Sequence, residues 1–247
     1  NPDFKSSELL EFLFKKAGMM CCWLNNIIYD SGLIPMVNDS AHGITINANK
    51  LIDYAKMSGV KEIKIPLSQS GYRKINNSNY ELFIDIGNIG PDYQPGHAHS
   101  DTFNFELHVN KFPIIVDTGI STYEKNELRQ HQRSTKSHNT VMIRDFEQSE
   151  LWAGFRVARR AKVFDIFSGE NQISAKHNGY KRMGYIHSRS FSWFKKEIII
   201  QDKLRKSSQG AAKAMFHFHS DVKKPKIDAN KVILNDHNIS ILFSGHS

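Results

Sequence analysis

The feature of this chain that most restricts its fold is a change of hydrophobic period near residues 60–70. Before that point, apolar residues recur at helical spacing, and after it apolar and polar residues alternate. The clearest alternation runs over residues 103–109, where phenylalanine, leucine and valine alternate with asparagine, glutamate and histidine. A period of two is typical of a half-buried strand. The chain is therefore predicted to begin with helices and to continue as a sheet protein.

Three helices are predicted before the change of period. The first covers residues 7–16 and ends at Gly18, and the second covers residues 19–29. A third helix is predicted over residues 47–58, with Gly59 as its C-cap.

Many short strands, separated by glycine, asparagine and serine, are predicted after the change. They cover residues 80–86, 103–109, a hairpin partner from 114, 140–143, 161–167, 172–175, 190–194, 197–201, 214–219 and 239–243. Strands at such short spacing indicate an antiparallel sandwich or layered sheets. We therefore expect a mainly β protein. In this interpretation an antiparallel β-sandwich over residues 67–247 follows a short α-helical segment over residues 1–66.

Composition narrows the class of partner. The formal net charge is +8 and the sequence pI is about 9.3, which favours polyanions such as an acidic polysaccharide, although a mildly basic surface has the same composition. No nucleic-acid-binding signature is present, so no nucleic-acid partner is expected. No apolar run is long enough for a membrane helix, so no membrane insertion is expected.

Two further features bear on the cellular context. The adjacent Cys21 and Cys22 cannot link distant segments, so we expect buried thiols and no disulfide framework. The chain starts at Asn1 rather than at a methionine, and we interpret it as a piece of a longer protein.

Polar residues beside apolar runs form the candidate site. His97 and His99 are two residues apart, Asp117 ends an apolar run, and His138 opens another. On a strand, residues i and i+2 share a face, so both histidines of the first pair can point into one cleft. Histidines with an aspartate can form a metal site, an acid–base site or both.

A zinc-type site uses three or four imidazole, carboxylate or thiolate ligands, and His99, Asp117 and His138 fit this if their strands are neighbours. The alternative is that each is a hydrogen-bonded core or turn residue. Arg133 can bind a carboxylate or sulfate through two parallel hydrogen bonds, or it is an ordinary surface arginine.

The ordered set of motifs resembles the heparinase II/III-like polysaccharide lyases. The resemblance is carried by residues 96–101, 115–119, 121–123 and 133–141, with weaker stretches at 36–41, 51–59, 152–155 and 179–182. It implies an N-terminal α/α toroid followed by an antiparallel β-sandwich, with the active site in the cleft between them. This chain would be the end of the toroid and most of the sandwich, and would pack against its own toroid.

The resemblance also implies roles for individual residues. It gives catalysis or carboxylate neutralisation to His97, metal binding to His99, Asp117 and His138, and substrate contact to Tyr123 and Arg133. The implied cofactor is zinc or another divalent metal, and two imidazole ligands favour zinc over calcium. The further base and acid of the reaction are expected upstream of residue 1.

The expected function is part of a polysaccharide lyase that cleaves a uronic-acid-containing acidic polysaccharide by β-elimination, in the periplasm or outside the cell. One alternative is a non-catalytic carbohydrate-binding or assembly module of the same fold. Another is a hydrolase whose metal activates water.

Overall fold

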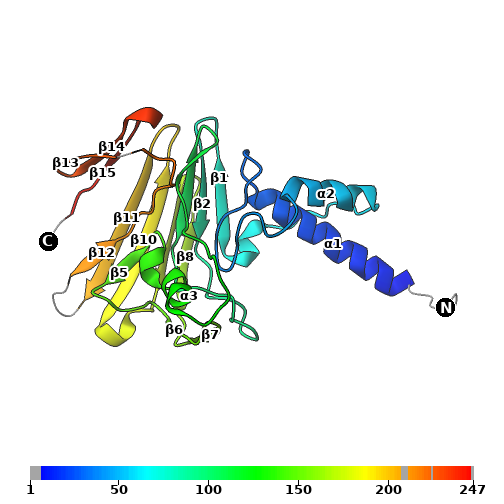
Figure 1. The fold of residues 1–247 in the computed structure, drawn as a ribbon, viewed down its shortest axis with the longest axis horizontal. Helices are drawn as coiled ribbons and strands as arrows, with labels where there is room; N and C mark the ends of the chain where they lie inside the picture. The colour runs from blue at the N-terminus through cyan, green and yellow to red at the C-terminus, as the bar shows by residue number, and fades with distance from the viewer. Residues whose placement is uncertain (1–6, 207–210, 224, 246–247) are drawn as a thin grey trace.

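The structure is a computed structural model that describes residues 7–206, 211–223 and 225–245. Two four-stranded antiparallel sheets form the body, and the N-terminal helices lie outside the first of them (Figure 1). The helical end and the C-terminal strands lie at opposite ends of the molecule in this view. The predicted mainly β class and antiparallel sandwich are confirmed.

Each main sheet has a simple strand order. The first sheet runs in the order β1 (Tyr72–Asn76), β2 (Tyr80–Asp85), β3 (Phe105–Val109) and β4 (Phe112–Ile115). The second runs in the order β11 (Ile198–Lys206), β10 (Tyr185–Trp193), β9 (Gln172–His177) and β8 (Val163–Ser168). Apolar side chains of both sheets form one core, in which the rings of Phe105 and Phe191 are 5.7 Å apart.

Smaller elements surround the two sheets. They are the pair β5 (Val141–Ile143) with β12 (Ala212–Ala214), the pair β6 (Glu150–Trp152) with β7 (Arg156–Ala158), the sheet β13 (Lys226–Asp228), β14 (Lys231–Leu234) and β15 (Ile239–Leu242), and the short helix α3 (Glu127–Gln132). The sequence did not predict β1, β6, β7, β13, β14 or α3. Most of these have only three to five residues and several carry charged side chains, so they show too little period to detect.

The first two predicted helices, over residues 7–16 and 19–29, form a single helix in the structure. The helix α1 (Ser7–Ile27) is continuous, and Gly18 lies inside it rather than at its end. A β-carbon on Gly18 would lie 2.2 Å from the carbonyl oxygen of Lys61, and the Gly18 carbonyl accepts a hydrogen bond from the Ile63 amide (3.1 Å). This glycine therefore permits a close backbone approach instead of ending the helix.

The third predicted helix, over residues 47–58, is confirmed as α2 (Ala48–Met57). The Asn47 side chain caps its first turn by accepting from the Asn49 amide, and Gly59, with a φ of 82°, follows its C-cap. None of the helices in the described ranges is long and apolar enough to span a membrane. The division into domains between residues 66 and 67 stays a prediction.

The strand β3 is buried on both faces rather than half-buried. Its polar face carries Glu106 and His108, which are 1% and 2% exposed. The segment after α1 covers this face: the Tyr29 hydroxyl donates to the Glu106 carboxylate (3.0 Å), and the Tyr29 ring stacks on His108. The predicted alternation of β3 is correct, but its polar face is buried because the segment after α1 packs on it. The sequence did not indicate this packing.

A relay of neutral histidines joins strands of the second sheet. The Gly179 amide donates to Nδ1 of His177 (3.1 Å), so the proton of that ring lies on Nε2 and is donated to Nδ1 of His187 (2.9 Å). His187 then donates from Nε2 to Asp202 (2.7 Å), which also accepts two hydrogen bonds from Arg189. Burial lowers the pKa of both histidines.

This relay predicts a loss of stability in mild acid. Below the ordinary histidine pKa of about 6.5, His177 and His187 bind protons in the unfolded chain but not in the folded one, so unfolding becomes easier as the pH falls. Each histidine is expected to lower the free energy of unfolding by at most about 1.4 kcal/mol per pH unit, in the window between its folded pKa and its ordinary value. Urea unfolding between pH 7.5 and 5.5 measures the slope. His177→Gln should reduce it, and an unchanged slope in that variant would contradict the assignment.

Candidate functional site

The candidate residues meet at one end of the sandwich. Because neighbouring strands of the first sheet are antiparallel, the C-terminal end of β2, the N-terminal end of β3 and the C-terminal end of β4 lie at the same end of the sheet. The loops that leave the sheet at these points carry His97, His99 and Asp117. His138 follows a 3-10 turn (Thr135–Ser137) immediately before β5. The topology therefore brings the predicted residues together from segments that are far apart in the sequence.

The two histidines of the 96–101 motif do not lie on a strand. Residues 86–104 form an irregular connection of turns and bends, so no pleat aligns the two rings. Instead both rings contact one carboxylate: Nδ1 of His97 lies 2.7 Å from Oδ2 of Asp39, and Nε2 of His99 lies 2.9 Å from Oδ1. The expectation that both point to one place is met, but through Asp39 of the helical segment, which the sequence analysis missed.

Asp39 also pairs with a buried arginine. The guanidinium of Arg129 donates to both oxygens of Asp39, at 2.5 and 2.8 Å. Burial raises the pKa of Asp39, but the hydrogen bonds from His99, Arg129 and His97 outweigh it and hold the pKa well below its usual range. Asp39 is therefore an ionised carboxylate that only accepts hydrogen bonds.

An ionised acceptor fixes the tautomer that each of the two rings adopts in its neutral form. His97 carries its proton on Nδ1 and His99 carries its proton on Nε2. The opposite nitrogens, Nε2 of His97 and Nδ1 of His99, are left with lone pairs. The side chain of His97 is 60% exposed, whereas that of His99 is completely buried. The nitrogen with a lone pair therefore belongs to an exposed ring in His97 and to a buried ring in His99.

His138 is held in a similar way by Asp117. Its Nδ1 lies 2.8 Å from Oδ2 of Asp117, and both side chains are fully buried. Burial lowers the pKa of His138, but the carboxylates of Asp117 and Asp101 outweigh it and raise the pKa to about 9. The same excess of negative charge that favours a proton here also favours a metal cation, which would replace that proton.

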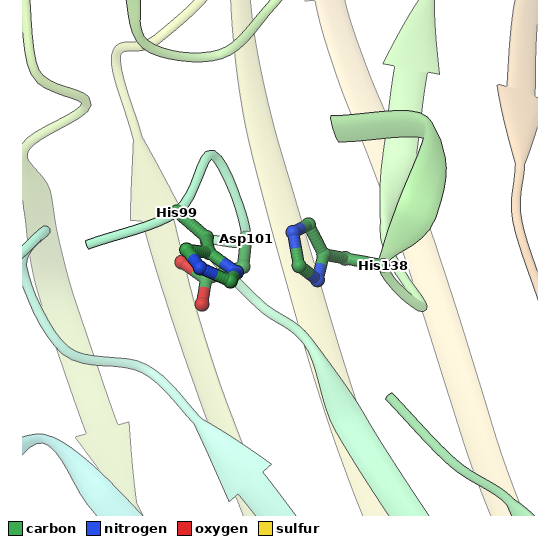
Figure 2. Close-up of side chains that lie close together, drawn as sticks. All are labelled: His99, Asp101 and His138. Carbon is green, nitrogen blue, oxygen red and sulfur yellow. The ribbon is translucent and has the colours of Figure 1, made fainter. Parts of the chain in front are cut away.

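The buried polar atoms without a hydrogen-bond partner among the described residues include Nδ1 of His99, Oδ2 of Asp101 and Nε2 of His138. The same three side chains each offer one ligand atom, and those atoms lie within 4.8 Å of one another. Figure 2 shows His99 and Asp101 close together with His138 on the opposite side. Buried unpaired polar atoms are costly. Two imidazoles and a carboxylate that converge in this way fit a divalent metal of the zinc type.

The carboxylate in this group differs from the predicted one. Both oxygens of Asp117 are already engaged: Oδ1 accepts from the Gly119 amide (2.8 Å), and Oδ2 accepts from the Asn104 side chain (2.6 Å) and from His138. Asp101, which ends the 96–101 motif two residues after His99, lies with the two histidines instead. The role of Asp117 as a direct ligand stays a prediction.

The two predicted substrate contacts lie in different environments. Tyr123 is half exposed, and its ring centroid lies 6.0 Å from that of His97. Arg133 is completely buried, and its guanidinium donates to the carbonyls of Ala98 (2.8 Å) and Gly154 (2.6 Å). We therefore assign Arg133 a structural role in holding the loop of His97, and we do not retain it as a substrate contact. The guanidinium N–H groups of Arg133 donate to backbone carbonyls rather than to a ligand.

Comparisons with solved structures support the fold. The chain aligns with a heparan sulfate lyase HepC from Pedobacter heparinus at 21% identity and a TM-score of 0.61, and with a heparinase III at 19% identity and a TM-score of 0.63. The alignments cover 84% and 92% of this chain but 35% and 39% of those proteins, so the chain spans little more than a third of their length. A comparison with curated proteins found no match.

A family model gives the classification. The model described as heparinase II/III-like, C-terminal, matches residues 61–246, which is well over half of the chain. This range contains both main sheets and His97, His99, Asp101 and His138. The chain therefore belongs to the heparinase II/III-like C-terminal family.

Proposed function

We propose that this chain is the sandwich part of a polysaccharide lyase that cleaves a uronic-acid-containing acidic polysaccharide by β-elimination. The observation that carries the proposal is the exposed ring of His97, which lies beside the half-exposed Tyr123. Its Nδ1 is hydrogen-bonded to Asp39, which forms a buried ion pair with Arg129. The names of the similar structures, a heparan sulfate lyase and a heparinase III, support an acidic substrate. The net charge of +8 suits such a polymer.

In the proposed reaction a base removes the C5 proton of the uronate, and the C–H electrons form the C4–C5 double bond. The C4–O4 bond breaks, and an acid protonates the departing O4. His97 serves through Nε2, which accepts a proton when the ring is neutral or donates a hydrogen bond to the uronate carboxylate when it is charged. Tyr123 contacts the sugar beside it. The further base and acid come from the toroid that precedes the sandwich in this family.

The proposal includes a divalent metal, zinc by the chemistry of its donors. His99 and His138 would hold it through the two unpaired nitrogens, and Asp101 would supply the carboxylate. Asp39 and Asp117 orient the two imidazoles from behind, as carboxylates commonly do at metal sites. When bound, the metal would link the loop of His97 to the start of β5 and hold both in place. A polymeric substrate also agrees with the expected periplasmic or secreted location.

The test uses the whole protein, including its toroid, with heparan sulfate, chondroitin sulfate and alginate as separate substrates. Elimination leaves a conjugated double bond, so ultraviolet absorbance should rise together with new reducing ends. New reducing ends without that absorbance would indicate a hydrolase. Binding of the polysaccharide without cleavage would indicate a carbohydrate-binding module, and both results would overturn the lyase proposal.

A further inference from the structure

We propose that Asp39 is a positioning residue that fixes the tautomer and the orientation of His97, so that the turn at residues 37–40, between α1 and α2, is part of the site. The catalytic consequence rests on the proposed function, whereas the tautomer does not. No sequence pattern pairs the two residues, because Asp39 lies 58 residues before His97 and on the other side of the predicted domain boundary.

Asp39 lies on a turn that hydrogen bonds of its two neighbours, Asn38 and Ser40, hold in place. Asn38 adopts the left-handed conformation (φ 53°), and its side-chain amide donates to the Tyr72 hydroxyl of β1 (2.9 Å). The Ser40 amide donates to the carbonyl of Val37 (3.1 Å), and Val37 is buried between the helical segment and the first sheet. A turn tied on both sides holds its carboxylate in a defined place, which a mobile loop could not do.

The hydrogen bonds to the Asp39 carboxylate hold two histidine rings and one arginine in fixed orientations. Each carboxylate oxygen accepts one hydrogen bond from a histidine and one from Arg129, and the Asp39 side chain is 5% exposed. Arg129 is itself fixed, because its Nε donates to the Gly154 carbonyl (3.1 Å) and its guanidinium lies over the rings of Tyr123 and Phe155. The plane of the carboxylate is therefore set by a fully buried group, and His97 takes its orientation from that plane.

This arrangement determines which nitrogen of His97 can react. With Nδ1–H donated to Asp39, the exposed Nε2 carries the lone pair that can accept a proton. If the tautomer were reversed, Nε2 would carry a hydrogen and could not act as a base. A wrong tautomer removes most of the contribution of a catalytic histidine, which is typically about 10²–10⁴-fold in rate.

The experiment must separate this role from folding, since Asp39→Leu alone would leave Arg129 buried without a counter-charge. We therefore compare the double variant D39L/R129M with R129M alone, in the whole protein with metal present. Long-range ¹H–¹⁵N spectra, recorded above the ordinary histidine pKa of about 6.5, report the tautomer of His97. R129M should keep the Nδ1–H form, whereas D39L/R129M should show the Nε2–H form.

The kinetic result should follow the spectra. Relative to R129M, the double variant is expected to lose at least about 100-fold in kcat, with a much smaller change in KM. Asp92→Asn is the matched control, because Asp92 also pairs with an arginine, Arg160, but contacts neither His97 nor His99 and lies 97% exposed at its side chain. That variant should keep the tautomer of His97 and the wild-type kcat.

Two outcomes would overturn the proposal. One is an Nε2–H tautomer of His97 in the wild-type protein, and the other is an Nδ1–H tautomer that persists in D39L/R129M. Neither depends on the substrate. If the wild type cleaves no polysaccharide but shows the Nδ1–H form that D39L/R129M loses, the lyase proposal fails and the positioning role of Asp39 stands.

Discussion

Replacing His97 with alanine is expected to reduce kcat of the whole protein by roughly 10²–10⁴-fold, which is the usual contribution of a general acid or base. The change should cost little stability, because the side chain is 60% exposed and its loss leaves Asp39 with two hydrogen bonds from Arg129 and one from His99. The measurements are the initial rate of unsaturated product formation and the Tm.

His42→Ala is a matched control for this prediction, since His42 is also an exposed loop histidine and follows Asp39 by three residues. It should keep both the rate and the Tm. A near-normal rate in His97→Ala would remove His97 from the mechanism. A large fall in Tm would mean that the lost rate reflects unfolding rather than chemistry.

Replacing His99 or His138 with alanine is expected to remove the metal and to destabilise the fold. Elemental analysis should find about one zinc per wild-type chain and almost none in either variant. A metal bound only to the folded state at 100–1,000 times its Kd adds about 3–4 kcal/mol of stability, which corresponds to a fall in Tm of roughly 5–15 °C on its removal. Chelation should lower the Tm of the wild type but not of His99→Ala.

The two candidate carboxylates can be separated by the same assay. Asp101→Asn should lose most of the metal, because Oδ2 of Asp101 has no other partner in the part of the chain that the structure describes. Asp117→Asn should weaken metal binding by about 10–100-fold, the usual effect of losing a carboxylate behind a ligating histidine. The reverse order would make Asp117 the direct ligand, as the sequence predicts. Absence of metal from the wild type would leave His99, Asp101 and His138 as core residues only.

Local patterns predicted most of the regular fold. The alternation over residues 103–109 and the strands that follow were sufficient for an antiparallel sandwich, because the pleat of a strand imposes a period of two on any sheet that buries a face. The same logic failed at Gly18, since a glycine that ends a helix and one that admits a neighbouring backbone look identical in sequence. It also failed at the polar face of β3, which Tyr29 covers.

For the site, the sequence indicated the identity of the important residues more reliably than the role of each residue. His97 and His99 were identified by their spacing and His138 by its position before an apolar run, and the structure brings all three to one end of the sandwich. Arg133 was expected to meet substrate but is buried against backbone carbonyls, because nothing in its local sequence shows which donors the loop of His97 would need.

What the sequence determined by itself is the antiparallel sandwich and the set of histidines, because both depend on short-range period and residue type. What only the tertiary structure decided is the partner of each ring: Asp39 for His97 and His99, and Asp117 for His138. Protonation and tautomer depend on such partners within hydrogen-bond distance, and these contacts join residues up to 60 positions apart. Packing of the helical segment on the sandwich creates the contacts of Asp39, and the meeting of loops within the sandwich creates the contact of Asp117 with His138.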